Sequence, residues 1–252
     1  MTRIETAKGG TVTDEVRQCA LKEGISAELL SQHIAQGLAV ITRNTLRDIA
    51  PVGIGKDLLT KINANIGTSK DRISIDEEKE KLEVLERLGC DAVMELSTGG
   101  PIRDLREFII KNTALPLGTV PIYEAAIKAA ETHGSIYKMT ADDMFGAIAD
   151  HAEQGVDFVT VHSGLTLRAV ERLKSQGRTL DIVSRGGSFL LEWMVMNKKE
   201  NPLYEDFGRL LDIAKKYDMT LSLGDALRPG CLADATDRAQ VEELLTLGEL
   251  RD

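Results

Sequence analysis

The sequence predicts an α/β fold in which successive strand–helix units build a parallel sheet. From about residue 60, short apolar runs of strand length alternate with longer segments whose apolar residues recur at helical spacing. Polar and glycine-rich clusters follow the runs, whereas the connections from helix to strand, such as RLGCD and EQGVD, are plain. In a parallel barrel the carboxyl ends of the strands open on one face, where loops build the active site. We therefore expect one site on one face of one sizeable domain, which 252 residues permit.

The first 55 or so residues are expected to form an N-terminal extension (1–55) that packs on the main domain (56–252). Thr13 is expected to cap a helix through about Lys22, and Ser26 a second helix through Gln36. A short strand is expected within the stretch GLAVITRNTLRDIAPVGIGK, before its turn rich in glycine and proline.

The main domain is expected to contain six strands and the helices between them. The expected strands are TKINANI, DAVMEL, LPLGTV, FVTVHS, LDIVS and MTLSLG. Helical spacing is clear in IDEEKEKLEVLERLG, MFGAIADHAEQG and EDFGRLLDIAKKYD. Strands that are buried on both faces and separated by helices favour a parallel sheet.

Composition and charge exclude several classes of protein. Hydrophobic residues make up 42% and charged residues 28%, which is typical of a soluble globular chain. No apolar run approaches the roughly 20 residues that a membrane span needs, and the first residues lack the apolar core of a signal peptide. The net charge of −9 argues against broad binding to nucleic acid or anionic membrane. We expect a cytoplasmic protein whose ligand is a small molecule.

Cysteines and histidines are too scattered to predict a metal site. The three cysteines are odd in number, and no pair has the C-x-x-C spacing of a zinc or iron–sulfur site. A reducing compartment also disfavours disulfides. Cys90 is expected to be a small core residue. The residues concerned are Cys19, Cys90, Cys231, His33, His133, His151 and His162.

The run Ser184-Arg185-Gly186-Gly187-Ser188 is the strongest candidate for a phosphate site. Its glycines let the backbone approach an anion, and the helix expected to follow, through about Asn197, directs free amides at it. Arg185 adds a planar donor fork if it faces inward. The alternative is a tight turn with Ser188 as a helix cap. The run STGG after the second strand is a weaker candidate for an anion nest.

Further ligand contacts are expected at other strand ends. Asp225 and Arg228 lie three residues apart in a loop, where they either bind an amine or hydroxyl and a phosphate, or pair with each other. His162 ends a strand, so its imidazole either contacts a ligand or is part of the hydrogen-bonded structure. Asn65 and Tyr123 fit as neutral polar contacts, with core packing as the alternative for Tyr123, and Met94 is expected in the core. The residues alone thus indicate a phosphorylated ligand, and they contain no Ser-His-Asp order, Walker loop or dinucleotide fingerprint.

Eight blocks of sequence resemble the phosphomethylpyrimidine synthase family over roughly residues 50–250. They are KINANIGTS, AVMELSTGG, PLGTVPIYEA, EQGVDFVTVHSG, IVSRGGS, KENPLYEDF, LSLGDALRPG and ADATDRAQVEELLTLGEL. The resemblance implies a TIM-type (β/α)8 barrel in a homodimer, of which this chain supplies about six βα units.

The resemblance also implies a reaction in thiamin biosynthesis. Family members are radical S-adenosylmethionine carbon–carbon lyases that rearrange 5-aminoimidazole ribotide to 4-amino-2-methyl-5-phosphomethylpyrimidine with a [4Fe–4S] cluster, and they also bind zinc. Carried over by motif, the implied substrate contacts are Asn65, Met94, Tyr123, His162, Ser184, Arg185, Gly186, Asp225, Ala226, Leu227 and Arg228. Met94 is therefore a ligand contact by resemblance and a core residue by pattern.

Two substitutions and an early end separate this chain from the family pattern. The family commonly has Asp where Glu95 stands and Gly where Ala226 adds a methyl group. Family members continue with zinc-ligating histidines and a C-x2-C-x4-C motif, which this chain lacks, so we expect that alone it does not make the radical. Alternatives are 5-hydroxybenzimidazole synthase, which uses the same ribotide in cobamide synthesis, and a non-catalytic protein that binds the ribotide or docks on a full-length partner.

Overall fold

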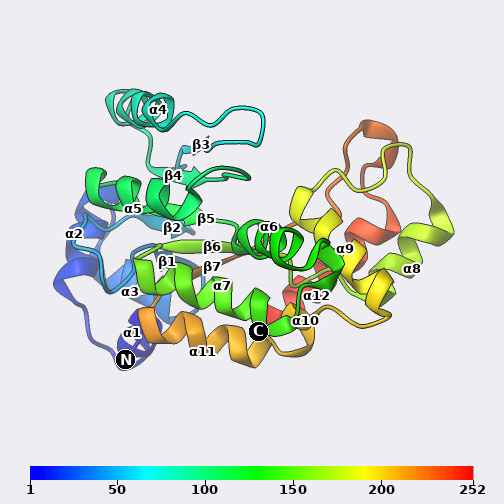
Figure 1. Cartoon of the computed structure of the whole chain (residues 1–252). Helices are drawn as coiled ribbons and strands as arrows, with labels where there is room; N and C mark the ends of the chain where they lie inside the picture. Colours follow the sequence, from blue (N-terminus) through cyan, green and yellow to red (C-terminus); the bar gives the residue numbers. More distant parts are fainter. Residues whose placement is uncertain (252) are drawn as a thin grey trace. The chain divides into compact units, whose positions relative to one another are not determined.

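The computed structural model describes residues 1–251 and has a mixed α/β fold (Figure 1). Its main sheet has the linear strand order β3-β4-β5-β6-β7, and β3–β4, β4–β5 and β5–β6 pair in parallel. The amide of Thr220 donates to Asp157 O (3.0 Å) and that of Gly224 to Val161 O (2.7 Å), so β7 also runs parallel to β6. The strands are β3 (Asn63–Ile66), β4 (Ala92–Glu95), β5 (Leu117–Thr119), β6 (Phe158–Val161) and β7 (Thr220–Leu223). The parallel α/β class is confirmed.

Helices fill the intervals between the strands, as the apolar spacing predicts. The three segments with clear helical spacing form α4, α7 and α11. The helices are α1 (Arg3–Lys8), α2 (Asp14–Glu23), α3 (Ala27–Ala35), α4 (Ile75–Arg87), α5 (Ile102–Asn112), α6 (Pro121–His133), α7 (Ala141–Gln154), α8 (Leu167–Gln176), α9 (Arg185–Asn197), α10 (Pro202–Glu205), α11 (Phe207–Tyr217) and α12 (Arg238–Arg251), with 3-10 turns η1 (Ile136–Lys138) and η2 (Leu232–Asp234). No helix among the described residues is long and apolar enough to cross a membrane.

One expected strand, LDIVS, is wrong. Residues 180–184 have no strand neighbour and lead directly into α9. The amides of Thr179 and Leu180 donate to the Asp234 carboxylate (2.7 and 2.9 Å), and Asp181 has a left-handed φ of 52°. Because the amides bond to a side chain and the backbone turns at Asp181, this segment cannot join a ladder.

The chain forms two compact units, each assembled from several stretches. The first contains Met1–Thr119, Ala149–Val159 and Asp212–Leu221, and the second contains Val120–Ile148, Thr160–Leu211 and the residues from Ser222 onward. The expected division at residue 55 remains a prediction.

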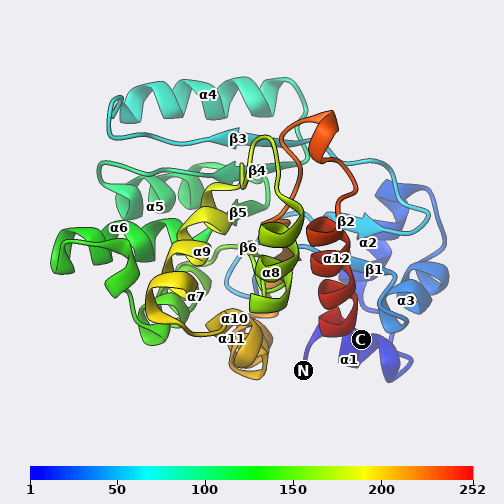
Figure 2. The same cartoon turned by 90° about the vertical axis from the view of Figure 1, so that its right-hand side faces the viewer.

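In the first unit, the N-terminal helices begin where the sequence predicts. Thr13 Oγ1 accepts the amide of Val16 (3.3 Å) at the start of α2, and Ser26 Oγ accepts that of Leu29 (3.2 Å) at the start of α3. Antiparallel β1 (Ala39–Ile41) and β2 (Gly53–Gly55) follow, so the expected short strand is confirmed. These elements share an apolar core centred on residues such as Cys19 and Leu30. In the same unit α4 runs alongside β3 (Figure 2).

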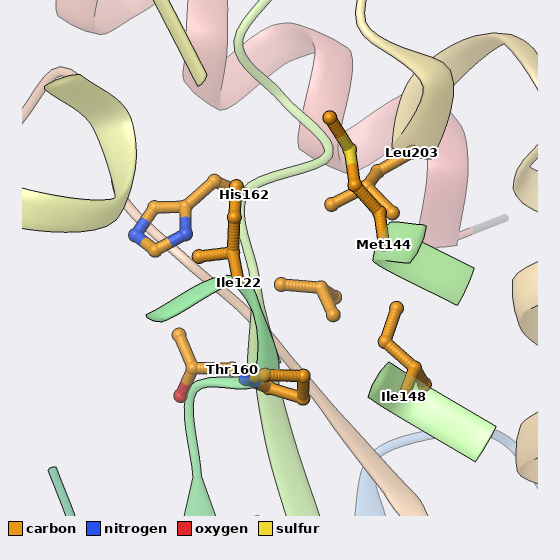
Figure 3. A pocket seen from close by; sticks show the side chains of 8 residues that line it. Ile122, Met144, Ile148, Thr160, His162 and Leu203 are labelled. Carbon is orange, nitrogen blue, oxygen red and sulfur yellow. The ribbon is translucent and has the colours of Figure 1, made fainter. Parts of the chain in front are cut away.

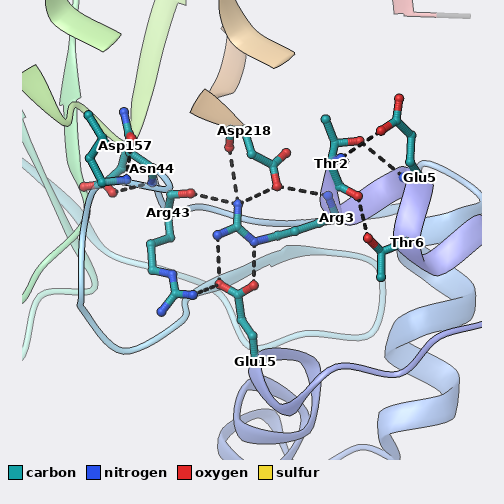
Figure 4. Close-up of polar contacts among 10 residues, drawn as sticks. Thr2, Arg3, Glu5, Thr6, Glu15, Arg43, Asn44, Asp157 and Asp218 are labelled. Atoms are coloured by element: carbon teal, nitrogen blue, oxygen red, sulfur yellow. Dashed lines mark hydrogen bonds and ion pairs between the residues drawn. The ribbon is translucent and has the colours of Figure 1, made fainter. Parts of the chain in front are cut away.

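Ion pairs and hydrogen bonds tie the N-terminal segment to the rest of the first unit. Arg3 donates to both carboxylate oxygens of Glu15 (2.7 and 2.9 Å) and to Asp218 Oδ2 (2.9 Å), as Figure 4 shows. The side-chain amide of Asn44 donates to Ala152 O (2.8 Å) and Val156 O (2.9 Å). The N-terminal segment therefore packs on residues 149–157 and on the end of α11, which lead into β6 and β7.

Candidate functional site

The strongest phosphate candidate lies at the start of α9, in the second unit. The helix begins at Arg185, and Ser184 is its N-cap: the Ser184 hydroxyl accepts the amide of Gly187 (3.1 Å). The alternative cap, Ser188, instead donates from its hydroxyl to Ser184 O (2.9 Å). A capped 13-residue helix directs its first amides and its positive end toward the Ser184–Gly186 turn, which is the arrangement that binds anions.

His162 lies directly against this turn and is almost fully buried. Its Nε2 is 3.2 Å from Ser184 Oγ, and its Nδ1 has no hydrogen-bond partner among the described residues. A Cβ on Gly186 would come 2.4 Å from His162 Cε1, so the ring occupies the space that this glycine leaves open. Burial lowers the pKa of His162 to about 4, an effect that Asp225 opposes and Arg228 reinforces. The imidazole is therefore neutral at pH 7, and its buried Nδ1 is unpaired among the described residues.

A small cavity adjoins the imidazole. It has a volume of about 10 Å³ and is lined by Thr160, His162 and apolar side chains from α6 and α7, including Ile122 and Met144 (Figure 3). That volume is about the size of one water molecule. The cavity is therefore a packing gap beneath the site rather than the ligand pocket itself.

Tyr123, at the start of α6, forms an aromatic platform in the same unit. The Arg185 guanidinium lies over its ring, with Cζ 5.0 Å from the centroid, and Phe189 meets the ring edge-on at 6.1 Å. Burial raises the pKa of the Tyr123 phenol, while the positive charges of Arg185 and Arg228 act to lower it. Both guanidinium groups thus lie within electrostatic range of one phenol.

The loop Asp225–Arg228 follows β7 and packs on the start of α9. A Cβ on Gly187 would lie 2.8 Å from Ala226 O and 3.0 Å from Ala226 Cβ, so this close approach requires a glycine there. The methyl group of Ala226 is fully buried against that turn, and Leu227 is fully buried as well. The exposed side chains of the loop are Asp225 and Arg228, which form an ion pair of 3.4 Å with each other.

Of the predicted contacts, the second unit brings together nine, and the other two lie in the first unit. Asn65 on β3 and Met94 on β4 are cross-strand partners in the parallel register. Asn65 is exposed and Met94 is half-buried, so Met94 is not a full core residue. The nine in the second unit are Tyr123, His162, Ser184, Arg185, Gly186, Asp225, Ala226, Leu227 and Arg228.

The candidate anion nest after β4 already has partners within the protein. The amide of Ser97 donates to Glu95 Oε1 (2.6 Å), and the amide of Thr98 donates to Thr68 O (2.8 Å). The Ser97 hydroxyl accepts the amide of Thr68 (2.9 Å). These contacts hold the loops after β3 and β4 together, so the structure favours a structural role for this turn.

Glu95 belongs to a buried polar network in the first unit that the sequence does not predict. Its Oε2 lies 3.9 Å from Nη1 of Arg106, whose side chain is fully buried. The same Nη1 is 2.9 Å from His151 Nε2, and His151 Nδ1 is 2.8 Å from Thr119 Oγ1. Because arginine only donates, His151 Nε2 accepts and Nδ1 carries the proton. The network joins the carboxyl ends of β4 and β5 to α5 and α7.

The described residues do not fit an iron–sulfur cluster or a zinc ion. Residues 1–251 contain no group of three or more His, Cys, Asp or Glu side chains placed to hold a metal. Cys19 is buried, and burial raises its thiol pKa to about 11, which disfavours the thiolate that binds metals. We derive no chemical step through either metal.

The fold and the candidate site together define a class: a parallel α/β protein with polar side chains at its strand ends and a capped helix start suited to an anion. The comparisons then identify the family. The Radical SAM ThiC family model matches residues 2–252, and the chain belongs to this family. It is 62% identical over 252 residues to the phosphomethylpyrimidine synthase of Thermodesulfovibrio yellowstonii, covering 100% of this chain and 59% of the relative.

Two further relatives carry the same name. The phosphomethylpyrimidine synthase of Dehalococcoides mccartyi (strain CBDB1) is 56% identical over 99% of this chain and 58% of its own length. Phosphomethylpyrimidine synthase 1 of Methanosarcina mazei is 53% identical over 99% of this chain and 58% of its own length. The chain thus spans about three-fifths of the length of these curated relatives.

Proposed function

We propose that this chain carries the substrate site of a phosphomethylpyrimidine synthase, which rearranges 5-aminoimidazole ribotide to 4-amino-2-methyl-5-phosphomethylpyrimidine in thiamin biosynthesis. The observation that carries the proposal is the packing of the Asp225–Arg228 loop against the start of α9. Arg185 is the first residue of that helix, and Arg228 ends the loop that packs against it. The names of the relatives support the pyrimidine product over the benzimidazole product.

In this proposal, different residues of the second unit bind different parts of the ribotide. Arg185, Arg228 and the first amides of α9 hold the phosphate, because guanidinium forks and helix starts both complement a dianion. Asp225 exchanges its ion pair with Arg228 for hydrogen bonds to an amine or hydroxyl of the ribotide. His162, neutral at pH 7, contributes a hydrogen bond without adding charge.

The same proposal covers the remaining parts of the enzyme. The five parallel strands belong to a TIM-type (β/α)8 barrel, Asn65 and Met94 are further substrate contacts, and the protein is a cytoplasmic homodimer. S-adenosylmethionine and a [4Fe–4S] cluster would be the cofactors of this enzyme and would supply its radical chemistry, although residues 1–251 contain no group of side chains that fits the cluster. Zinc would be a further cofactor.

Calorimetric titration of the purified chain with 5-aminoimidazole ribotide tests the proposal. We expect saturable binding that Asp225→Asn weakens by about tenfold or more, the value of one charge-assisted hydrogen bond. Asp150→Asn, a change of an exposed carboxylate on α7, is the matched control and should bind like the wild type. The unphosphorylated riboside should bind more weakly than the ribotide. No binding by the folded wild-type chain would contradict the proposal.

A further inference from the structure

Glu243, on α12, is a buried acid whose carboxylate binds the backbone of the Asp225–Arg228 loop. Its side chain lies behind the loop, where Oε1 accepts the amide of Ala226 and Oε2 the amide of Leu227, both at 2.7 Å. The residue is 3% exposed, and burial raises the pKa of its carboxyl group to about 7. A carboxylate kept in such an environment is costly unless its two hydrogen bonds are needed.

Arg178 holds the same loop through its carbonyl groups. Nη2 donates to Leu227 O (2.6 Å) and Nη1 to Arg228 O (3.5 Å). The guanidinium is itself fixed by Asp237, which accepts from Nε (2.6 Å) and from Nη2 (2.8 Å). Side chains from outside the loop therefore take two amides and two carbonyls of this short segment.

We propose that Glu243 is a positioning residue for the substrate site: by accepting the amides of Ala226 and Leu227 it sets the direction in which Asp225 and Arg228 project. This inference rests on the proposed function, because it assigns those two side chains to the ligand. The loop connects β7 to η2, and its two peptide planes are fixed by the carboxylate rather than by a neighbouring strand. Rotation of either plane redirects the side chains at both ends.

A carboxylate is the side chain that suits this role. It offers two acceptor oxygens and no donor, whereas glutamine would place an NH2 group against one of the amides. Protonation of Glu243 has a similar effect, since it converts one acceptor into a hydroxyl. The charged groups that face Glu243 are Asp225, which raises its pKa further, and Arg178, which lowers it. Its neighbour Glu242 pairs instead with Arg168 and Arg172 of α8.

Amide hydrogen exchange resolved by NMR tests whether Glu243 orders the loop. In Glu243→Gln, the Ala226 and Leu227 amides should exchange about tenfold faster or more, the equivalent of one hydrogen bond to a charged group. Glu242→Gln, one residue away on the same helix, is the matched control and should leave them unchanged. If Glu243→Gln does not fold, the wild type suffices: protection of the two amides should fall from pH 8 to pH 6, while that of Val170 in α8 stays constant. Equal exchange in both variants, or constant protection with pH, would overturn the inference.

Ribotide affinity, measured in the same three proteins, separates the inference from the proposed function. A loss of about tenfold or more in Glu243→Gln, with wild-type affinity in Glu242→Gln, supports both. Faster exchange with unchanged affinity would refute the positioning role, because the loop would be mobile without consequence for the ligand. Faster exchange in Glu243→Gln, combined with a wild-type chain that binds no ribotide, would refute the proposed function while leaving the ordering of the loop by Glu243 intact.

Discussion

Adding one methyl group at Gly186 should disturb the centre of the candidate site. In Gly186→Ala the new Cβ would meet His162 Cε1 at 2.4 Å and Nδ1 at 2.8 Å, distances that real side chains do not adopt. The ring is buried and bonded to Ser184, so it cannot move aside without losing that contact. Overpacking of this kind costs about 1–3 kcal/mol.

The matched control is Gly146→Ala in α7. Gly146 is also helical, but an added Cβ there meets nothing within 4 Å. Removing a glycine from a helix interior should stabilise the chain by about 0.5–1 kcal/mol. The two substitutions add the same methyl group, so they should change stability in opposite directions.

Thermal unfolding followed by circular dichroism measures both effects. For a chain of this size about 1 kcal/mol shifts the melting temperature by about 2–4 °C. We expect a clear fall for Gly186→Ala and a small rise for Gly146→Ala, with shifted NMR signals of His162 in the first variant only. A Gly186→Ala protein as stable as Gly146→Ala, with unchanged His162 signals, would refute the packing described here.

Two further predictions concern buried charges. Burial lowers the pKa of His162 from 6.5 to about 4. Between pH 6.5 and pH 4 the imidazole is therefore protonated in the unfolded chain but not in the folded chain. Protonation of the unfolded chain lowers the stability of the wild type as the pH falls through this range. The difference in unfolding free energy between the wild type and His162→Gln should therefore shrink by up to about 3 kcal/mol between pH 7 and pH 4. Urea unfolding measures this difference. Glu243 acts in the opposite direction over this pH range, but its contribution cancels because both proteins contain it. Arg106→Met should destabilise the chain by about 3–5 kcal/mol at pH 7, because it removes the cation beside the buried Glu95 carboxylate. Arg103→Met, on the exposed face of the same helix, should cost less than about 1 kcal/mol. Equal urea midpoints for the two arginine variants would contradict the role given to this network.

Local sequence patterns identified much of the fold because their signals depend on near neighbours. Thr13 and Ser26 cap helices through amides three residues away, and α4, α7 and α11 follow the helical spacing of their apolar residues. The segment LDIVS has the composition of a strand, but the amides of its first residue, Leu180, and of the preceding Thr179 donate to Asp234, which lies 54 and 55 residues further along the chain. No pattern of neighbouring residues indicates that a distant carboxylate competes with a neighbouring strand for these amides.

The sequence by itself determined the parallel α/β class and the residue types at the strand ends, and its motif blocks pointed to the family. Only the tertiary structure decided which of those residues meet, and it added Glu243 and Arg178, which read in sequence as ordinary surface charges. The physical reason is that local spacing predicts which face of a helix or strand a residue occupies. Whether a charge on that face is buried, and what it bonds to, depends on segments that folding brings together. Glu243 accepts hydrogen bonds from two amides 16 and 17 residues away, and the positioning role proposed for it rests on those two contacts.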